Sequence, residues 1–187
     1  MAIRTPASTF HAVESRYQKL RNLVYIATKK AFPTLPITLR EITFHDAMHA
    51  DQWSAQWDSR TKRPIWSWVD MYNRYHNHNL LKRFEIALVA NGSLIALCYG
   101  IPSKNKVFLK IHTVARKPDN NPLAGDVLNI VFFAAMAYAE LIGSREIWLV
   151  KPMNETLVEK YRQYGYNPQR DKSGQVTHLS LKVNHEQ

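Results

Sequence analysis

The spacing of apolar residues near the start of the chain predicts a long helix. From Ser8 to Ala31, apolar or small residues recur at steps of three and four, which is the spacing of one helix face. These residues are Val13, Tyr17, Leu20, Val24, Ala27 and Ala31. Pro33 and Pro36 follow, and because proline breaks a helix interior, we expect the helix to end before them.

The next segments predict one strand followed by two helices. Ile37–Phe44 alternates apolar and polar residues, as a half-buried strand does. Asp46–Ser59 and Pro64–His78 are rich in aromatic residues and predict helices, and Pro64 suits a first helical turn.

Three strand-like runs follow in close succession and predict an antiparallel meander. They are Phe84–Ala90, Ser93–Ile101 and Val107–Val114. Asn91-Gly92 lies between the first two, and Asn-Gly between alternating runs is a strong hairpin signal. The short connection at 102–106 predicts a second hairpin.

The last third of the chain alternates helices and strands. Asp126–Ile142 is a long apolar helix that we expect to end at Gly143. Glu146–Val150 predicts a buried strand, Glu155–Tyr164 a helix and Val176–Val183 a final strand. Strand–helix–strand steps imply a parallel or mixed sheet on this side. The fold class predicted from the whole pattern is mixed α/β.

Charge adds a preference for anionic partners. The 187 residues suit one domain, and 25 Lys and Arg against 15 Asp and Glu give a net charge of +10. Such a surface favours nucleic acid, a phosphorylated cofactor or an acidic protein, and the charge alone does not choose among them. Seven of the basic residues lie in the first 40 positions, against one acid, Glu14. We therefore separate a basic helical extension, 1–35, from the domain at 36–187.

The basic helix leaves two interpretations open. It could bind nucleic acid or an acidic protein, or it could pack on its own domain with a solvated basic side. The longest apolar run, Ile130–Ala139, is shorter than the ~20 residues that cross a bilayer, so we expect no membrane partner. The first residues lack a secretory signal pattern, so we expect a cytoplasmic protein. The sequence leaves open whether the protein forms a homodimer.

Single residues exclude several kinds of site. The lone cysteine, Cys98, excludes an intramolecular disulfide and a zinc site made of cysteines. His45 and His49 have the i, i+4 spacing of zinc ligands, but no third ligand is identifiable. We therefore expect no metal site.

A polar loop joins the strand at 107–114 to the long apolar helix. Backbone N–H groups at a helix N-terminus, together with the helix dipole, favour a phosphate or pyrophosphate, and Arg116 and Lys117 add positive charge. The alternative is an ordinary strand-to-helix connection.

The segment after this helix carries a recognisable spacing of asparagine, tyrosine and glycine. The residues are Asn154, Leu157, Tyr161, Gly165 and Tyr166. Taken together with the order of the predicted elements, this spacing makes residues 84–183 resemble the later half of the sequence pattern of the GCN5-related N-acetyltransferase (GNAT) superfamily. The strand and two helices predicted upstream also fit the order of elements in that family. The resemblance implies a mixed, mostly antiparallel sheet with one splayed parallel strand pair, flanked by helices, plus the N-terminal helical extension.

The resemblance also implies acetyl-coenzyme A (acetyl-CoA) as co-substrate, lying where the strands at 107–114 and 146–150 splay. The main chain of Thr113 and Val114 would pair with the pantetheine arm, Asn154 would hydrogen-bond to it, and Tyr161 would act as general acid for the departing thiolate. The pyrophosphate would meet backbone N–H groups of the loop. The loop residues concerned are Asn121, Leu123, Ala124, Gly125 and Asp126.

The loop departs from the family pattern. Gly125 is kept, but Leu123 stands where the family has its first glycine, and Pro122 removes an N–H donor. These departures motivate a second hypothesis, a catalytically silent GNAT-fold module that binds nucleic acid or an acidic protein.

The leading hypothesis is an N-acetyltransferase that moves an acetyl group to a primary amine by direct attack on the thioester. The acceptor is open. An uncharged amine is needed for attack, so a general base is expected, and the candidates are His112 and Glu85.

Overall fold

The computed structural model describes residues 6–53, 67–77, 80–118, 120–123 and 125–184. Its elements are α1 (Pro6–Ala31), β1 (Ile37–Arg40), α2 (Phe44–Trp53), α3 (Trp68–Asn77), β2 (Phe84–Ala90), β3 (Ser93–Pro102), β4 (Phe108–Arg116), α4 (Val127–Ile142), β5 (Glu146–Val150), α5 (Glu155–Arg162), β6 (Asn167–Arg170) and β7 (Val176–Lys182).

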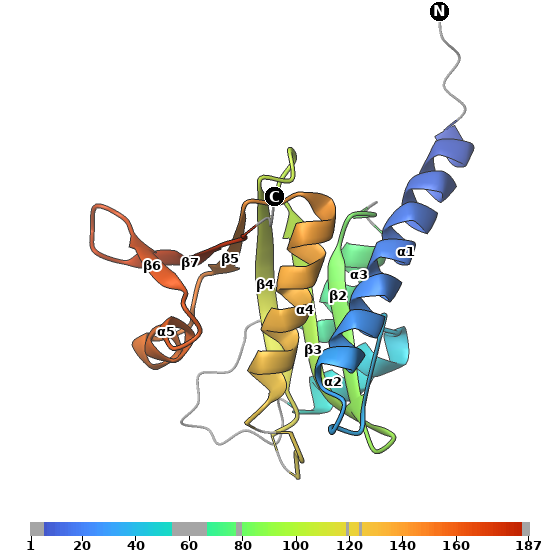
Figure 1. The fold of residues 1–187 in the computed structure, drawn as a ribbon, viewed down its shortest axis with the longest axis horizontal. Helices are drawn as coiled ribbons and strands as arrows, with labels where there is room; N and C mark the ends of the chain where they lie inside the picture. Colours follow the sequence, from blue (N-terminus) through green and yellow to red (C-terminus); the bar gives the residue numbers. More distant parts are fainter. Residues whose placement is uncertain (1–5, 54–66, 78–79, 119, 124, 185–187) are drawn as a thin grey trace, which may run out of the picture.

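The described strands form one seven-stranded sheet in the order β1-β2-β3-β4-β5-β7-β6. Of its neighbouring pairs, β4 and β5 are parallel and the others are antiparallel. In Figure 1, α1 and α4 lie side by side on one face of the sheet, and α2 and α3 lie on the other. This arrangement confirms the predicted mixed α/β fold, with the strand meander in the centre.

The two faces of the sheet have separate cores. Ile86 and Leu109 pack with side chains of α1 and α4 on one face. Leu97 and Tyr99 pack with side chains of α2 and α3 on the other. Neighbouring residues of a strand point to opposite faces, so each central strand contributes to both cores. β2 and β3 are therefore apolar at nearly every position, as expected for strands covered on both sides, whereas burial alternates along β4.

Helix α1 packs into the first core, but the side of the helix that is buried differs from the predicted side. Tyr17 and Val24 are buried as expected, whereas Ala27 is exposed. Arg21 and Thr28 occupy the buried stripe instead. The Thr28 hydroxyl is satisfied by donating to the carbonyl of Val24 at 2.8 Å. The prediction was wrong at Ala27 and at Ala31, which is also exposed, because it counted only apolar residues.

Arg21 is buried because carboxylates surround it. Its guanidinium donates to Glu14 at 2.8 Å and to Glu41 at 2.7 Å, and Glu14 also binds Arg83, which directly precedes β2. A buried charge needs such partners, so this cluster fastens α1 to the domain. The boundary near residue 35 therefore marks a change in sequence pattern, while the core continues across it.

Some element ends differ from prediction for local reasons. β1 stops at Arg40 because the Asp46 carboxylate accepts hydrogen bonds from Thr43 and Arg40 and starts α2 at Phe44. β6 was not predicted, since NPQR is largely exposed and does not alternate. The helices predicted over 46–59 and 64–78 correspond to α2 and α3, and residues 54–66 and 78 lie outside the described residues.

No helix in the described part of the chain is both long and apolar enough to cross a membrane.

Candidate active site

Strands β4 and β5 separate partway along their length. Their parallel register runs from Phe108–Glu146 to Ile111–Leu149. β4 then continues to Arg116, while β5 ends at Val150. The cause lies on the other side of β4. Against β3, Tyr99 pairs with Thr113 and Gly100 pairs with Ile111, which leaves His112 without a partner residue.

His112 is therefore the extra residue of a β-bulge, and a bulge bends its strand and increases its twist. The bulge coincides with the end of the β4–β5 pairing, so it turns β4 away from β5 and opens the sheet there. Gly100 makes the bulge possible. A Cβ at this position would lie 2.8 Å from the backbone oxygen of Lys110, closer than real Cβ atoms come to backbone.

A cleft occupies the opening between the two strands. β4 contributes His112, Thr113 and Val114 to its walls, and α5 contributes Leu157 and Tyr161. The structure thus brings together four of the residues predicted for the site, His112, Thr113, Val114 and Tyr161, although they lie up to 49 positions apart in sequence.

Tyr161 lines the cleft from the side of α4. Its ring meets the ring of Phe132 edge-on at 5.8 Å between centroids. Burial raises the pKa of the Tyr161 phenol to about 12. The hydroxyl therefore keeps its proton at neutral pH and can donate it.

His112 approaches the cleft from the opposite face, where its ring meets Tyr75 of α3 edge-on at 6.3 Å. Burial lowers the pKa of His112, and the positive charges of Arg74 and Lys110 lower it further. The imidazole is therefore neutral at pH 7 and can accept a proton. Arg74 was not predicted as a site residue, and its position on a helix gives no sequence signal for this role.

Glu85, the other candidate base, lies elsewhere. Its carboxylate is fully buried on β2 and accepts hydrogen bonds from Arg83 at 2.6 Å and from the backbone N–H of Ile42 at 3.1 Å. His76 of α3 contacts it at 3.2 Å. Burial acts to raise the pKa of Glu85, but His76, Arg83 and Arg21 outweigh burial and lower it. This carboxylate ties β2 to α1 and α3, and the structure does not bring it to the cleft.

The loop before α4 uses several of its own N–H groups. The N–H of Leu123 donates to the side-chain oxygen of Asn121 at 2.9 Å, and the N–H groups of Asp126 and Val127 donate to the carbonyl of Leu123 at 2.9 and 3.0 Å. The Leu123 side chain is buried in the core and does not cover the loop. Gly125 is exposed with open space beside it, and Ala124 lies outside the described residues.

Asn154 has a local structural role. Its side-chain oxygen accepts the N–H of Leu157 at 2.9 Å and caps the N-terminus of α5. The asparagine therefore fixes where α5 begins, and with it the height of Tyr161 two turns later.

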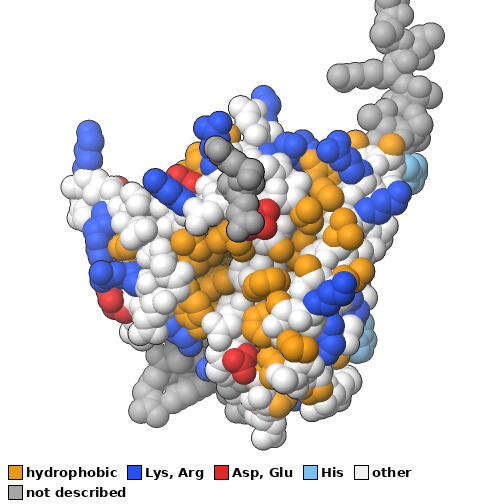
Figure 2. Space-filling view, in the orientation of Figure 1, with side chains coloured by type: hydrophobic (Ala, Val, Ile, Leu, Met, Phe, Trp, Pro, Cys, Tyr) orange, Lys and Arg blue, Asp and Glu red, His pale blue; other side chains and the backbone are white. Residues whose placement is uncertain are grey.

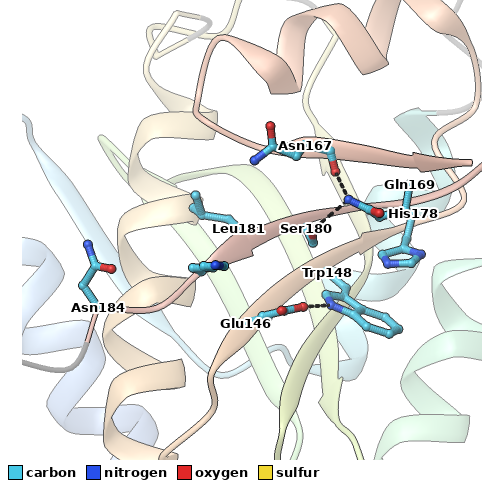
Figure 3. A pocket seen from close by; sticks show the side chains of 9 residues that line it. Glu146, Trp148, Asn167, Gln169, His178, Ser180, Leu181 and Asn184 are labelled. Atoms are coloured by element: carbon cyan, nitrogen blue, oxygen red, sulfur yellow. Dashed lines mark hydrogen bonds between the residues drawn. The ribbon is translucent and has the colours of Figure 1, made fainter.

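A second concave surface is lined by side chains of β5, β6 and β7 (Figure 3). Two of these side chains, Trp148 and His178, stack ring on ring with centroids 4.0 Å apart, and Phe108 of β4 stacks on Trp148 at 3.9 Å. The Trp148 indole N–H donates to Glu146 at 2.7 Å, and the ammonium of Lys110 lies 5.5 Å from the Trp148 ring. Within the described residues, no three His, Cys, Asp or Glu side chains gather as metal ligands would.

Solved structures share this architecture. The ribosomal-protein-S18-alanine N-acetyltransferase from Escherichia coli matches with a TM-score of 0.58 and 15% identity, covering 81% of this chain and 96% of that one. Ard1 from Thermoplasma volcanium matches with a TM-score of 0.59 and 14% identity over 81% and 100% of the two chains. The PaiA N-acetyltransferase from Thermoplasma acidophilum, solved with coenzyme A, gives 0.55 and 15% over 78% and 98%.

Sequence comparison gives no corresponding match. No protein-family model matches this chain, and no curated protein matches it. At such low identity, the common ground with the solved structures is the fold. From its strand order, splayed parallel pair and structural matches, the chain has the fold of the GCN5-related N-acetyltransferase superfamily.

Proposed function

We propose that this protein is an acetyl-CoA-dependent N-acetyltransferase that acetylates a primary amine by direct attack on the thioester. The observation that carries the proposal is the cleft at the His112 bulge, where a neutral imidazole and a protonated phenol face one opening from two sides of the sheet.

The backbone beside the cleft fits the amide-containing pantetheine arm of acetyl-CoA. Beyond Ile111, the edge of β4 that faced β5 has left its pairing partner. An extended ligand can pair with such an edge as an added strand does. Thr113 and Val114 would supply the main-chain groups.

In this reaction His112 would accept a proton and Tyr161 would stabilise the leaving group. The amine nitrogen attacks the thioester carbonyl carbon and gives a proton to His112, and the carbon–sulfur bond breaks to release the thiolate. A free thiol has a pKa of about 8.5, whereas the pKa of Tyr161 is about 12. Tyr161 therefore stabilises the departing sulfur chiefly by hydrogen bonding, and its proton moves only as negative charge develops there.

The charges around His112 narrow the class of acceptor. Arg74 and Lys110 create a positive field that disfavours a further cation and favours the neutral form of a nearby amine. A polycationic acceptor would be repelled. We therefore assign an acceptor that carries negative charge besides its amine, with the wall around Trp148 and His178 available to contact it.

A specific observation favours the second candidate, a GNAT-fold binding module without catalysis. The N–H groups of Leu123, Asp126 and Val127 are hydrogen-bonded within the loop, and Pro122 has none, so fewer donors are free for a pyrophosphate. If this loop cannot hold the cofactor, the cleft lacks its substrate.

The experiment compares cofactor binding with turnover. Differential scanning fluorimetry with acetyl-CoA should raise the Tm of the wild type, and coenzyme A release in the presence of a panel of anionic amines should identify the acceptor. His112→Gln and Tyr161→Phe should keep the Tm shift and lose turnover. A Tm shift with wild-type turnover in both variants would remove their catalytic roles, and an unchanged Tm at millimolar acetyl-CoA would reject the enzyme and leave the binding module.

A further inference from the structure

The outer face of α1 and α4 exposes large apolar side chains. Leu23 and Ile26 of α1 are 53% and 54% exposed, and Phe133 and Leu141 of α4 are 41% and 46% exposed. The two helices pack against each other, so these side chains belong to one surface. Figure 2 shows the hydrophobic side chains gathered on this face, with basic side chains along it. We call it the α1–α4 face.

The basic side chains follow a regular stripe. Arg16, Lys19 and Lys30 are exposed, and with Leu23 and Ile26 they are spaced by three or four residues along α1. Residues at this spacing share one side of a helix. The stripe is therefore apolar at its centre and positive at both ends.

Few acidic side chains lie near these cations to neutralise their charge. The helix has one acid, Glu14, and its carboxylate is bound to Arg21 and Arg83. On α4, Glu140 is exposed next to Leu141. The face thus has a positive edge on α1 and a single described negative charge on α4.

The arrangement of apolar and charged side chains on the α1–α4 face indicates which kind of partner can bind there. Nucleic acid presents phosphates throughout, and an apolar centre offers it no contact. A two-fold contact between copies would bring the cations of two α1 helices together. An anionic membrane would bury Glu140 against like charge. An amphipathic helix with an apolar stripe and an acidic edge meets both the centre and the positive edge.

We propose that the α1–α4 face docks an amphipathic α-helix of a partner protein, with acidic residues along the edge that lies over α1. Leu23, Ile26 and Phe133 contact its apolar stripe, and Arg16, Lys19 and Lys30 pair with its acids. This inference is independent of the acetyl-transfer reaction, because the face lies outside the cleft between β4 and β5.

The test uses three fluorescein-labelled 18-residue helical peptides in anisotropy titrations with the full chain. One has a leucine stripe with a glutamate edge, the second has the same stripe with a lysine edge, and the third has the residues of the first in scrambled order. The first peptide should bind at least ten-fold more tightly than the other two. Leu23→Gln with Ile26→Gln should weaken it at least ten-fold, and Lys19→Glu with Lys30→Glu should reverse the preference between the first two peptides.

Met48→Gln is the matched control, since Met48 is 48% exposed but lies on α2, and it should leave binding unchanged. Equal binding of the three peptides, or binding that ignores the α1 substitutions, would overturn the proposal. Two further outcomes would also overturn it. They are a dimer in sedimentation equilibrium that Leu23→Gln dissociates, and tight binding to phosphatidylcholine–phosphatidylglycerol vesicles that Lys19→Glu abolishes.

Discussion

Replacing Gly100 with alanine tests whether the bulge in β4 opens the cleft. The added Cβ would lie 2.8 Å from the backbone oxygen of Lys110 and 3.0 Å from Cδ1 of Ile111. The Ile111 side chain can move, but the oxygen belongs to the strand itself. The contact is relieved only if β4 shifts away from β3 beside His112. Forcing such a shift in a packed interior costs about 1–3 kcal/mol.

Urea denaturation measures this cost, and acetyl-CoA titration measures its consequence for the cleft. We expect Gly100→Ala to unfold at lower urea with an unchanged m-value, and to bind acetyl-CoA more weakly because the Thr113–Val114 edge has moved. Gly125→Ala is the stability control, since a Cβ there meets no atom within 4 Å. Equal stability and equal affinity of Gly100→Ala and the wild type would refute the link between the bulge and the cleft.

Three further predictions concern individual side chains. Tyr161→Phe should lower kcat by about 10²-fold with little change in acetyl-CoA affinity, as steady-state kinetics and calorimetry would reveal; a kcat within two-fold of wild type contradicts the role. The pKa of His112 is lowered below its ordinary value of 6.5, so the fall of kcat/KM that protonation of His112 causes should be centred below pH 6.5 and should be absent in His112→Gln; a fall centred above pH 6.5 argues against His112. Glu85→Gln removes the fully buried carboxylate of the Glu85–Arg83 pair, leaving Glu14 as the remaining carboxylate partner of Arg83, and should destabilise the fold by about 3–5 kcal/mol in urea at pH 7. Because the folded pKa of Glu85 is lowered, this contribution is present above the unfolded pKa of about 4.3 and is lost as pH falls through the folded pKa; a variant as stable as wild type at pH 7 contradicts the ion-pair account.

Much of the fold follows from residue patterns because its central elements are covered on one or both faces. The meander and α4 are apolar enough to be located within two residues. β6 was missed because Asn167–Arg170 pairs at an exposed edge where no alternation is needed. The stripe of α1 was misjudged because the buried Arg21 pairs with Glu41, which lies beyond the helix, as well as with Glu14 of α1, and a partner beyond the helix leaves no periodic signal.

The site was predictable to a smaller extent. The spacing around Tyr161 and the strand position of His112 located two sides of the cleft, and a glycine inside a strand, Gly100, is a signal for a bulge that could have been used. Glu85 could not be placed from sequence, because its partners come from α3, the segment before β2 and the segment after β1. The internal hydrogen bonds of the loop at Leu123 depend on backbone geometry that the sequence does not display.

Isothermal titration calorimetry of the wild-type protein with acetyl-CoA tests the central claim most directly. The open edge of β4 beside Tyr161 predicts saturable one-to-one binding that Gly100→Ala weakens. Absence of saturable heat up to about 1 mM acetyl-CoA, which corresponds to less than about 4 kcal/mol of binding free energy, would contradict it.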